Sequence, residues 1–244
     1  MWRLISAEIA RESAFMSIWG KFGEAIGGAF GTLADWLRPG IGIESAQADV
    51  VFTIAVIALS AKMAKADGVV TPDEVAAFER LFRVAPAEVR NVRRLFDLAR
   101  RDTAGYETYA RQIARRFAGN SGVLEDILDG LFEIAKADGV LHPGESAFLE
   151  RVADIFGFAP NEFRRIKASH FAPEASDPYL ILGVDYHATD EEIRRTFLRL
   201  VRENHPDSLI GRGVPPEFVR LATDKLAAIN GAYEKLKSER GRNS

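Results

Sequence analysis

Apolar residues recur at helical spacing along almost the whole chain, and no stretch shows the strict alternation of a half-buried strand. The clearest cases lie near the C-terminus, where two segments each gather their apolar positions on one helical face. The first face consists of Ile193, Phe197, Leu200 and Val201, and the second of Ala222, Leu226, Ile229, Tyr233 and Leu236. The pattern predicts an all-α protein that ends in an antiparallel helical hairpin.

Residues that start and stop helices set the limits of this C-terminal unit. Asp177-Pro178 supplies a cap and a first helical residue, and Gly183 can end the short helix that follows. Thr189-Asp190-Glu191-Glu192 has the spacing of a capping box and should open the first hairpin helix. That helix must stop before Pro206, because proline disfavours helical geometry in the residue before it. We therefore expect one unit over 177–244.

The tip of the hairpin carries His205-Pro206-Asp207, and we expect a loop through Gly211, Gly213 and Pro215-Pro216 after it. The first hairpin helix also has a basic stripe beside its apolar face. This stripe is formed by Arg194, Arg195, Arg199 and Arg202. On the last helix, we expect the lysines at 225, 235 and 237 to be surface residues.

Residues 49–170 have the pattern of a bundle of about seven helices and contain an internal repeat. The segment 64–69, Ala-Lys-Ala-Asp-Gly-Val, recurs unchanged at 135–140. Each copy predicts a helix, a tight Asp-Gly turn and a second helix. Gly68 and Gly139 suit the left-handed backbone that ends a helix. A short linker over 171–176 separates this bundle from the C-terminal unit.

Residues 1–48 are rich in glycine and aromatic residues and predict a loosely ordered segment. Contact with a membrane surface through residues 17–36 is the alternative, since Trp and Phe favour the lipid boundary. No run is long enough for a membrane-spanning helix, which needs roughly 20 apolar residues. Met16 is a second candidate for the natural start.

Composition excludes several classes of function. The 244 residues are 47% hydrophobic and 27% charged with a net charge of −3, so bulk nucleic-acid binding is not expected. The chain has no cysteine, which removes disulfides and thiol chemistry and suits a reducing compartment. Its four histidines form no His-Glu-x-x-His motif, and no phosphate-binding glycine loop is present. We expect no enzyme.

The C-terminal unit resembles the J-domain of the DnaJ family, and its loop after the tripeptide resembles the DjlA-like branch. The resemblance covers about 65 residues in order. It rests on 177–179, 182–184, 192–195 with Phe197 and Leu200, the His205-Pro206-Asp207 tripeptide, and 229–230 with 232–233. Asn204 and Ser208 depart from the Tyr and Lys that many J-domains have on either side of the tripeptide.

This resemblance implies a co-chaperone that stimulates ATP hydrolysis by a DnaK-type chaperone. Asp207 would offer a carboxylate to an arginine of the partner, Pro206 would hold the shape of the loop, and His205 would add hydrogen bonds and packing. The arginine stripe would steer the encounter with an acidic partner surface. We expect a cytoplasmic protein with roles in folding and stress response, with peripheral contact at the inner membrane as the alternative.

The repeated Lys-Ala-Asp-Gly signature resembles the TerB-like helical domain associated with tellurite resistance, and DjlA-like proteins place such a domain before their J-domain. TerB-like domains have been proposed to bind divalent metal through acidic residues. Carried onto this chain, the candidates are Asp67, Glu74, Asp138 and Glu145. Turn and capping roles for these residues are the alternative. A metal-responsive adaptor or stress-response scaffold acting through this domain is the second functional hypothesis.

Overall fold

The computed structural model describes residues 48–66, 105–137, 139–171, 177–212, 214 and 218–241, with a few positions between 76 and 93. The helices are α3 (Ala48–Ala66), α6 (Tyr106–Arg116), α7 (Ser121–Ala135), α8 (Pro143–Phe156), α9 (Pro160–His170), α10 (Pro178–Leu182), α11 (Asp190–Glu203), α12 (Pro206–Gly211) and α13 (Val219–Gly241). No strand occurs in this part of the chain, and the predicted all-α class is confirmed. The predicted segment 1–48 and the linker 171–176 lie almost wholly outside the described residues.

Several predicted helix starts and stops are present. Thr189 Oγ1 accepts the backbone N–H of Glu192 at 3.2 Å, which is one half of the capping box at the start of α11. Asp177 Oδ1 accepts the N–H of Tyr179 at 2.9 Å and caps α10. Gly183 ends α10 with a φ of 67°, which only glycine adopts at low cost. Local sequence therefore sets the limits of these helices.

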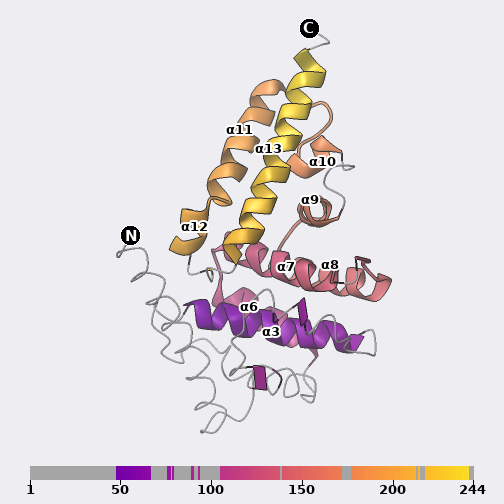
Figure 1. Ribbon diagram of the computed structural model, residues 1–244, viewed down its shortest axis with the longest axis vertical. Coiled ribbons are helices and arrows are strands. Elements are labelled where there is room, and N and C mark those ends of the chain that lie inside the picture. Colours follow the sequence, from indigo (N-terminus) through magenta and orange to yellow (C-terminus); the bar gives the residue numbers. More distant parts are fainter. Residues whose placement is uncertain are drawn as a thin grey trace.

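Helices α10 to α13 form the C-terminal unit. In Figure 1, α11 and α13 lie side by side and run in opposite directions, with α10 packed beside them. Their apolar faces meet in a compact core of Ile181, Leu182, Ile193, Leu200, Ile229, Ala232 and Leu236. The rings of Phe197 and Tyr233 stack across the hairpin with centroids 4.0 Å apart. The predicted hairpin is present.

Helices α3 and α6 to α9 form the N-terminal bundle, which lies beside one end of the hairpin (Figure 1). Helix α3 is central to it, because its described side chains from Phe52 to Met63 are buried. In the second copy of the repeat, Gly139 has a φ of 84° and precedes α8, as the Asp-Gly turn predicts. Gly68 in the first copy lies outside the described residues.

The N-terminal bundle and the C-terminal unit share one hydrophobic core. Leu209, Val214 and Phe218 pack in the same apolar cluster as α3 and α7. The Phe218 ring meets Phe52 edge to face with centroids 4.7 Å apart, and it lies over Gly130 of α7. A Cβ at Gly130 would fall 2.6 Å from that ring, so this contact needs glycine. The C-terminal unit is therefore seated directly on the bundle.

Two predictions about the C-terminal unit were wrong. The segment after the tripeptide is not all loop, because residues 206–211 form α12, which is held by buried Leu209. Lys225 is not a surface residue, because α7 covers it and supplies carboxylates for its ammonium group. Lys235 and Lys237 are exposed, as expected.

Within the described ranges, no helix is both long and apolar enough to cross a membrane.

Candidate partner-binding site

The His205-Pro206-Asp207 corner lies where α11 ends and α12 begins. Helix α11 ends at Glu203, and the buried Asn204 side chain donates a 2.8 Å hydrogen bond to the carbonyl of Leu200. His205 then takes an extended backbone, and Pro206 occupies the first position of α12. The ring of Pro206 fixes φ for a helical start and needs no N–H partner there. The turn is therefore built into the local sequence.

The imidazole of His205 caps α12. Its Nδ1 accepts the backbone N–H of Asp207 at 3.2 Å and lies 3.6 Å from a carboxylate oxygen of that residue. A neutral imidazole that accepts at Nδ1 carries its proton at Nε2. The side chains of His205 and Asp207 are 53% and 88% exposed, respectively. The corner therefore presents an N–H donor and a carboxylate to solvent, side by side.

The other side of α12 is anchored to the protein. The carbonyl of His205 accepts the N–H groups of Ser208 and Leu209 at 2.9 and 3.2 Å. Ser208 Oγ donates to the carbonyl of Arg202 at 2.7 Å, which ties α12 back to the last turn of α11. Leu209 is buried in the shared core. These hydrogen bonds and the buried Leu209 form an ordered base that holds the exposed tripeptide in place.

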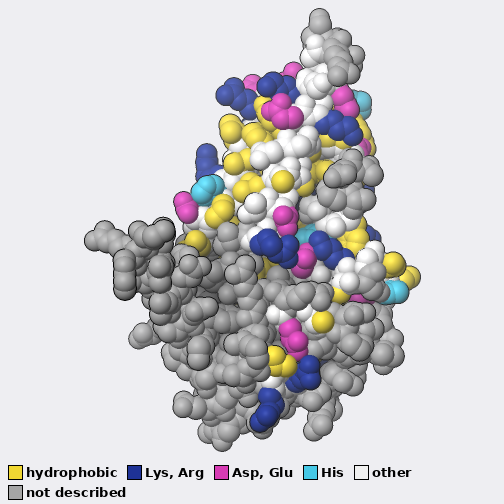
Figure 2. Space-filling model, in the orientation of Figure 1, with side chains coloured by type: hydrophobic (Ala, Val, Ile, Leu, Met, Phe, Trp, Pro, Cys, Tyr) yellow, Lys and Arg dark blue, Asp and Glu magenta, His cyan; other side chains and the backbone are white. Residues whose placement is uncertain are grey.

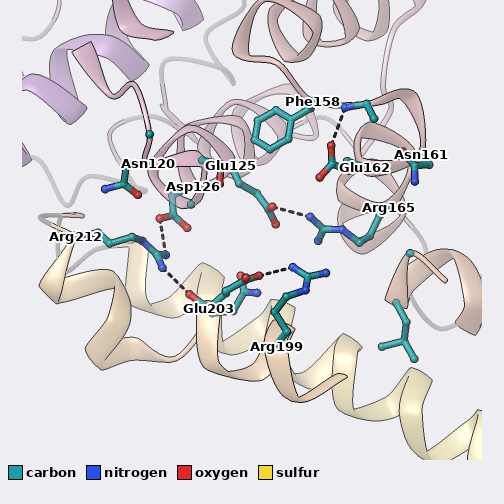
Figure 3. A pocket seen from close by; sticks show the side chains of 17 residues that line it. Asn120, Glu125, Asp126, Phe158, Asn161, Glu162, Arg165, Arg199, Glu203 and Arg212 are labelled. Carbon is teal, nitrogen blue, oxygen red and sulfur yellow. Dashed lines mark hydrogen bonds and ion pairs between the residues drawn. The ribbon is translucent and has the colours of Figure 1, made fainter. Parts of the chain in front are cut away.

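The four arginines of the predicted stripe are all exposed along α11. Arg199 is placed differently from the other three, because its Nη1 lies 2.7 Å from Glu203 and it lines the cleft toward the N-terminal bundle (Figure 3). Exposed pairs of this kind contribute little stability, since water screens them. Arg194, Arg195 and Arg202 remain as the basic surface of α11, with Arg202 in the last turn before the tripeptide.

Sequence reasoning missed a buried group of charges that joins the two parts of the molecule. We call it the α7 charge cluster, and it comprises Glu125, Asp126, Asp129, Arg165, His170, Arg212 and Lys225. In Figure 2, acidic and basic side chains are exposed where the lower end of α13 meets α7, whereas the members of the cluster are themselves largely buried. Three carboxylates of one helix thereby meet cations from α9, from α13 and from the end of α12.

The contacts in the α7 charge cluster are short. Lys225 Nζ lies 2.8 Å from Asp129 Oδ2 and also bonds Glu125. Arg165 Nη2 lies 2.6 Å from Glu125 Oε2, and Arg212 Nη2 lies 2.8 Å from Asp126 Oδ2 (Figure 3). Buried charges need such pairing, because each has lost its hydration.

The acidic members of the cluster differ in their protonation. Burial is the largest single effect and raises the pKa of Glu125 and of Asp129. The partners together outweigh it, Lys225 with Arg165 at Glu125 and Lys225 with His170 at Asp129, so both pKa values are lowered. At Asp126 burial prevails over Arg212 and Lys225, and its pKa rises to about 7. Asp126 is therefore the carboxyl group in this cluster that titrates near neutral pH.

A cleft of about 520 Å³ lies between the N-terminal bundle and the C-terminal unit, and the N-terminal ends of α7 and α9 line one side of it. Figure 3 shows Glu125, Asp126, Arg165, Arg199, Glu203 and Arg212 around it, drawn from both parts of the molecule. Carboxylates and guanidinium groups pair with one another across the walls. The cleft is thus a polar seam between the N-terminal bundle and the C-terminal unit.

Three of the four candidate metal ligands, Asp67, Glu74 and Asp138, lie outside the described residues. Glu145 is buried, and one of its carboxylate oxygens accepts the backbone N–H of His142 at 2.9 Å at the start of α8. Among the residues that the structure describes, no group of three potential ligands converges on one point. Glu145 therefore has a helix-capping role here, and metal binding stays a prediction.

Comparison with known proteins agrees with this architecture. Residues 53–168 match the family described as tellurite resistance protein TerB, and residues 177–244 match the DnaJ domain. The C-terminal unit is thus a J-domain, and the chain belongs to the J-domain co-chaperones.

Curated relatives narrow the family. The chain is 28% identical to "Co-chaperone protein DjlA" of Photobacterium profundum over 78% of each protein. It is 26% identical to the protein of that name from Vibrio vulnificus over 83% of each, and 30% identical to that of Shewanella oneidensis over 50% of the chain and 52% of the relative. No solved structure matches significantly. The chain is a DjlA-like protein, with a TerB-like domain before its J-domain.

Proposed function

We propose that this protein stimulates ATP hydrolysis by a DnaK-type chaperone through its His205-Pro206-Asp207 corner and the basic face of α11. The observation that carries the proposal is the exposed pair of His205 and Asp207 on an ordered base. Partner contact needs both groups accessible and held in one geometry, since a flexible loop would lose entropy on binding.

Each group has a distinct task in this mechanism. The Asp207 carboxylate would accept charge-assisted hydrogen bonds from an arginine of the partner. The His205 Nε2–H would donate to a partner acceptor, while Nδ1 keeps the cap on α12. Arg194, Arg195 and Arg202 would attract an acidic partner surface and raise the association rate. The protein itself would hydrolyse nothing and would favour the hydrolysis-competent state of its partner.

We also propose that the protein works in the cytoplasm. The full sequence has no cysteine, which suits a reducing compartment. The alternative of membrane-surface contact through 17–36 concerns residues that the structure does not describe, so it stays a prediction.

A titration of the DnaK-type partner with the full chain tests the proposed function. The partner's steady-state ATP turnover should rise and saturate, and the chain alone should give no turnover. Raising the salt from about 0.05 to 0.3 M should increase the concentration needed for half-maximal stimulation, because salt screens the arginines. No rise in turnover at any concentration of the chain would refute the proposal.

A further inference from the structure

Arg212 connects the partner-binding corner to the TerB-like domain. Its Nη1 donates to the carbonyl of Glu203 at 2.7 Å, at the end of α11. Its Nη2 bonds the Asp126 carboxylate of α7 at 2.8 Å. Its backbone N–H closes α12 on the carbonyls of Ser208 and Leu209. One arginine residue therefore joins the end of α12 to the end of α11 and to the TerB-like domain (Figure 3).

These bonds enclose the tripeptide. Residues 203 and 212 lie on either side of His205, Pro206 and Asp207, and Arg212 closes that segment into a ring. Arg212 bonds the carbonyl through Nη1 and the carboxylate through Nη2, two nitrogens held at a fixed separation in one plane. The ammonium of a lysine would have to reach both acceptors from a single nitrogen. The Arg212 side chain also packs against Gly122 of α7, where a Cβ would lie 3.2 Å from its Cζ. The ring is thereby fixed to the surface of the TerB-like domain.

Burial of the neighbouring segment supports the same role. Leu209, Val214 and Phe218 all enter the core that α3 and α7 build. The exposed side of α12 presents the tripeptide, and its covered side lies on the TerB-like domain. Isolated helices as short as α12 are unstable in water, so the conformation of this segment depends on the domain beneath it.

We infer that Arg212 is a positioning residue through which the TerB-like domain holds the His205-Pro206-Asp207 corner in its active geometry. The inference rests on the proposed function. It gives the TerB-like domain a direct part in stimulating the partner, as the platform for the corner. The domain acts by holding the geometry of the corner.

The test compares the full-length variants Arg212→Gln and Arg212→Lys in the titration of the partner's ATP turnover. Arg212→Gln should lower the maximal stimulation about fivefold or more, because a small displacement of a group that assembles a catalytic geometry, even far from the chemistry, can cost large factors in rate. The half-maximal concentration should change by less than about twofold, since the basic face of α11 is intact. Arg212→Lys should also fall short of the wild type, because lysine keeps the charge but loses the fork.

Arg220→Gln is the matched control. Arg220 is also an arginine of the J-domain that pairs with a carboxylate of α7, Glu133 at 3.3 Å, but it does not touch residues 203–212 in any bond of the structure. Its maximal stimulation should equal that of the wild type. Full activity in Arg212→Lys, or an unchanged maximum with only a raised half-maximal concentration in Arg212→Gln, would overturn the positioning role.

Hydrogen exchange without the partner separates this inference from the proposed function. In Arg212→Gln, the amides of Ser208, Leu209 and residue 212 should exchange about tenfold faster, with the amides of α11 unchanged up to Leu200. If Arg212→Gln fails to fold, Asp126→Asn gives the same comparison above about pH 7, where the wild-type carboxyl group is ionised. Asparagine has nearly the same shape and leaves only a neutral acceptor for the guanidinium. Unchanged exchange in α12 would refute the inference even if the wild type stimulates the partner fully. Faster exchange with no stimulation by the wild type would refute only the proposed function.

Discussion

Lys225 of α13 places its ammonium 2.8 Å from the carboxylate of Asp129 in α7, and both side chains are more than nine-tenths buried. The two residues are 96 positions apart in the chain. Their contact joins the J-domain to the TerB-like domain inside the protein, where neither charge can be hydrated. The two domains consequently depend on each other for the pairing of their buried charges.

This dependence predicts a large loss of stability when the lysine charge is removed. Lys225→Met keeps the aliphatic stem but leaves Glu125 and Asp129 short of a cation. Breaking a buried pair from one side costs about 3 kcal/mol or more of the free energy of unfolding, which urea denaturation would measure. Lys235→Met, an exposed site on the same helix, should stay within about 0.5 kcal/mol of the wild type. Equal stability of the two variants would contradict the buried pair.

Asp126 predicts a specific dependence of stability on pH. Burial raises its folded pKa to about 7 from an ordinary value of 3.8, so the folded state binds this proton more tightly than the unfolded state. The wild type therefore loses stability from this group as the pH rises from 4 toward 7, and the loss is complete above pH 7. The amide of the Asp126→Asn variant cannot titrate. Between pH 5 and 8, the stability of this variant relative to the wild type should rise by about 2.7 kcal/mol.

Denaturation of both proteins at several pH values would measure that difference. Lys225, Arg212, Arg165, Glu125, Asp129 and Glu203 surround this region in both proteins, so their titration largely cancels. A difference that stays flat with pH would show that the Asp126 carboxyl group is ionised throughout this range. Above about pH 7, where the wild-type carboxyl group is ionised, the same variant should stimulate the partner less well, because a neutral acceptor holds Arg212 more weakly. Greater stability together with lower activity would indicate that the Asp126 carboxylate positions Arg212 at a cost in stability.

The close packing at Gly130, where the J-domain contacts α7, predicts that an added methyl group will destabilise the protein. In Gly130→Ala, the new Cβ would meet the buried Phe218 ring at 2.6 Å, and one of the two helices must move. We expect a loss of about 1–3 kcal/mol of the free energy of unfolding, as for other overpacked cores. Gly231→Ala on α13, with open space around the Cβ, should stabilise the protein by up to about 1 kcal/mol. Thermal or urea denaturation of the pair would decide, and a stabilised Gly130→Ala would rule out the close packing.

The basic face of α11 should control encounter with the partner more than the maximal effect. Arg195→Gln should raise the half-maximal concentration about threefold at low salt and leave the maximal stimulation near that of the wild type. Its shift should shrink at high salt, where the charges are screened. Arg115→Gln, an exposed arginine on α6, is the control and should behave like the wild type. Equal behaviour of both variants at low salt would exclude steering by this face.

The sequence predicted what short-range patterns determine. The hairpin follows from apolar spacing in α11 and α13, and the limits of α10 and α11 follow from Asp177, Gly183 and Thr189. The tripeptide corner could be located because a proline ends α11 wherever the rest of the chain lies. The roles of His205 and Asp207 at that corner stay predictions.

What the sequence did not predict depends on contacts between distant segments. In the sequence of α13, nothing distinguishes Lys225 from an exposed lysine. It is buried only because α7 packs over it in the folded protein. Helix α12 looked like a loop because of Gly211, Gly213 and the prolines, although Pro206 at its first position carries the same start signal as Pro178. A usable signal was present in α7, where Glu125, Asp126 and Asp129 interrupt an otherwise apolar segment. Buried carboxylates at such positions need cations from elsewhere.

The proposed function is tested most directly by measuring the partner's ATP turnover in the presence of His205→Gln and of Asp207→Asn. Both side chains are exposed, so the variants should keep wild-type helicity and melting temperature, with His187→Gln as a control at an exposed histidine away from the corner. We predict that either variant removes stimulation while His187→Gln retains it. Wild-type stimulation by a folded His205→Gln or Asp207→Asn protein would contradict the central claim.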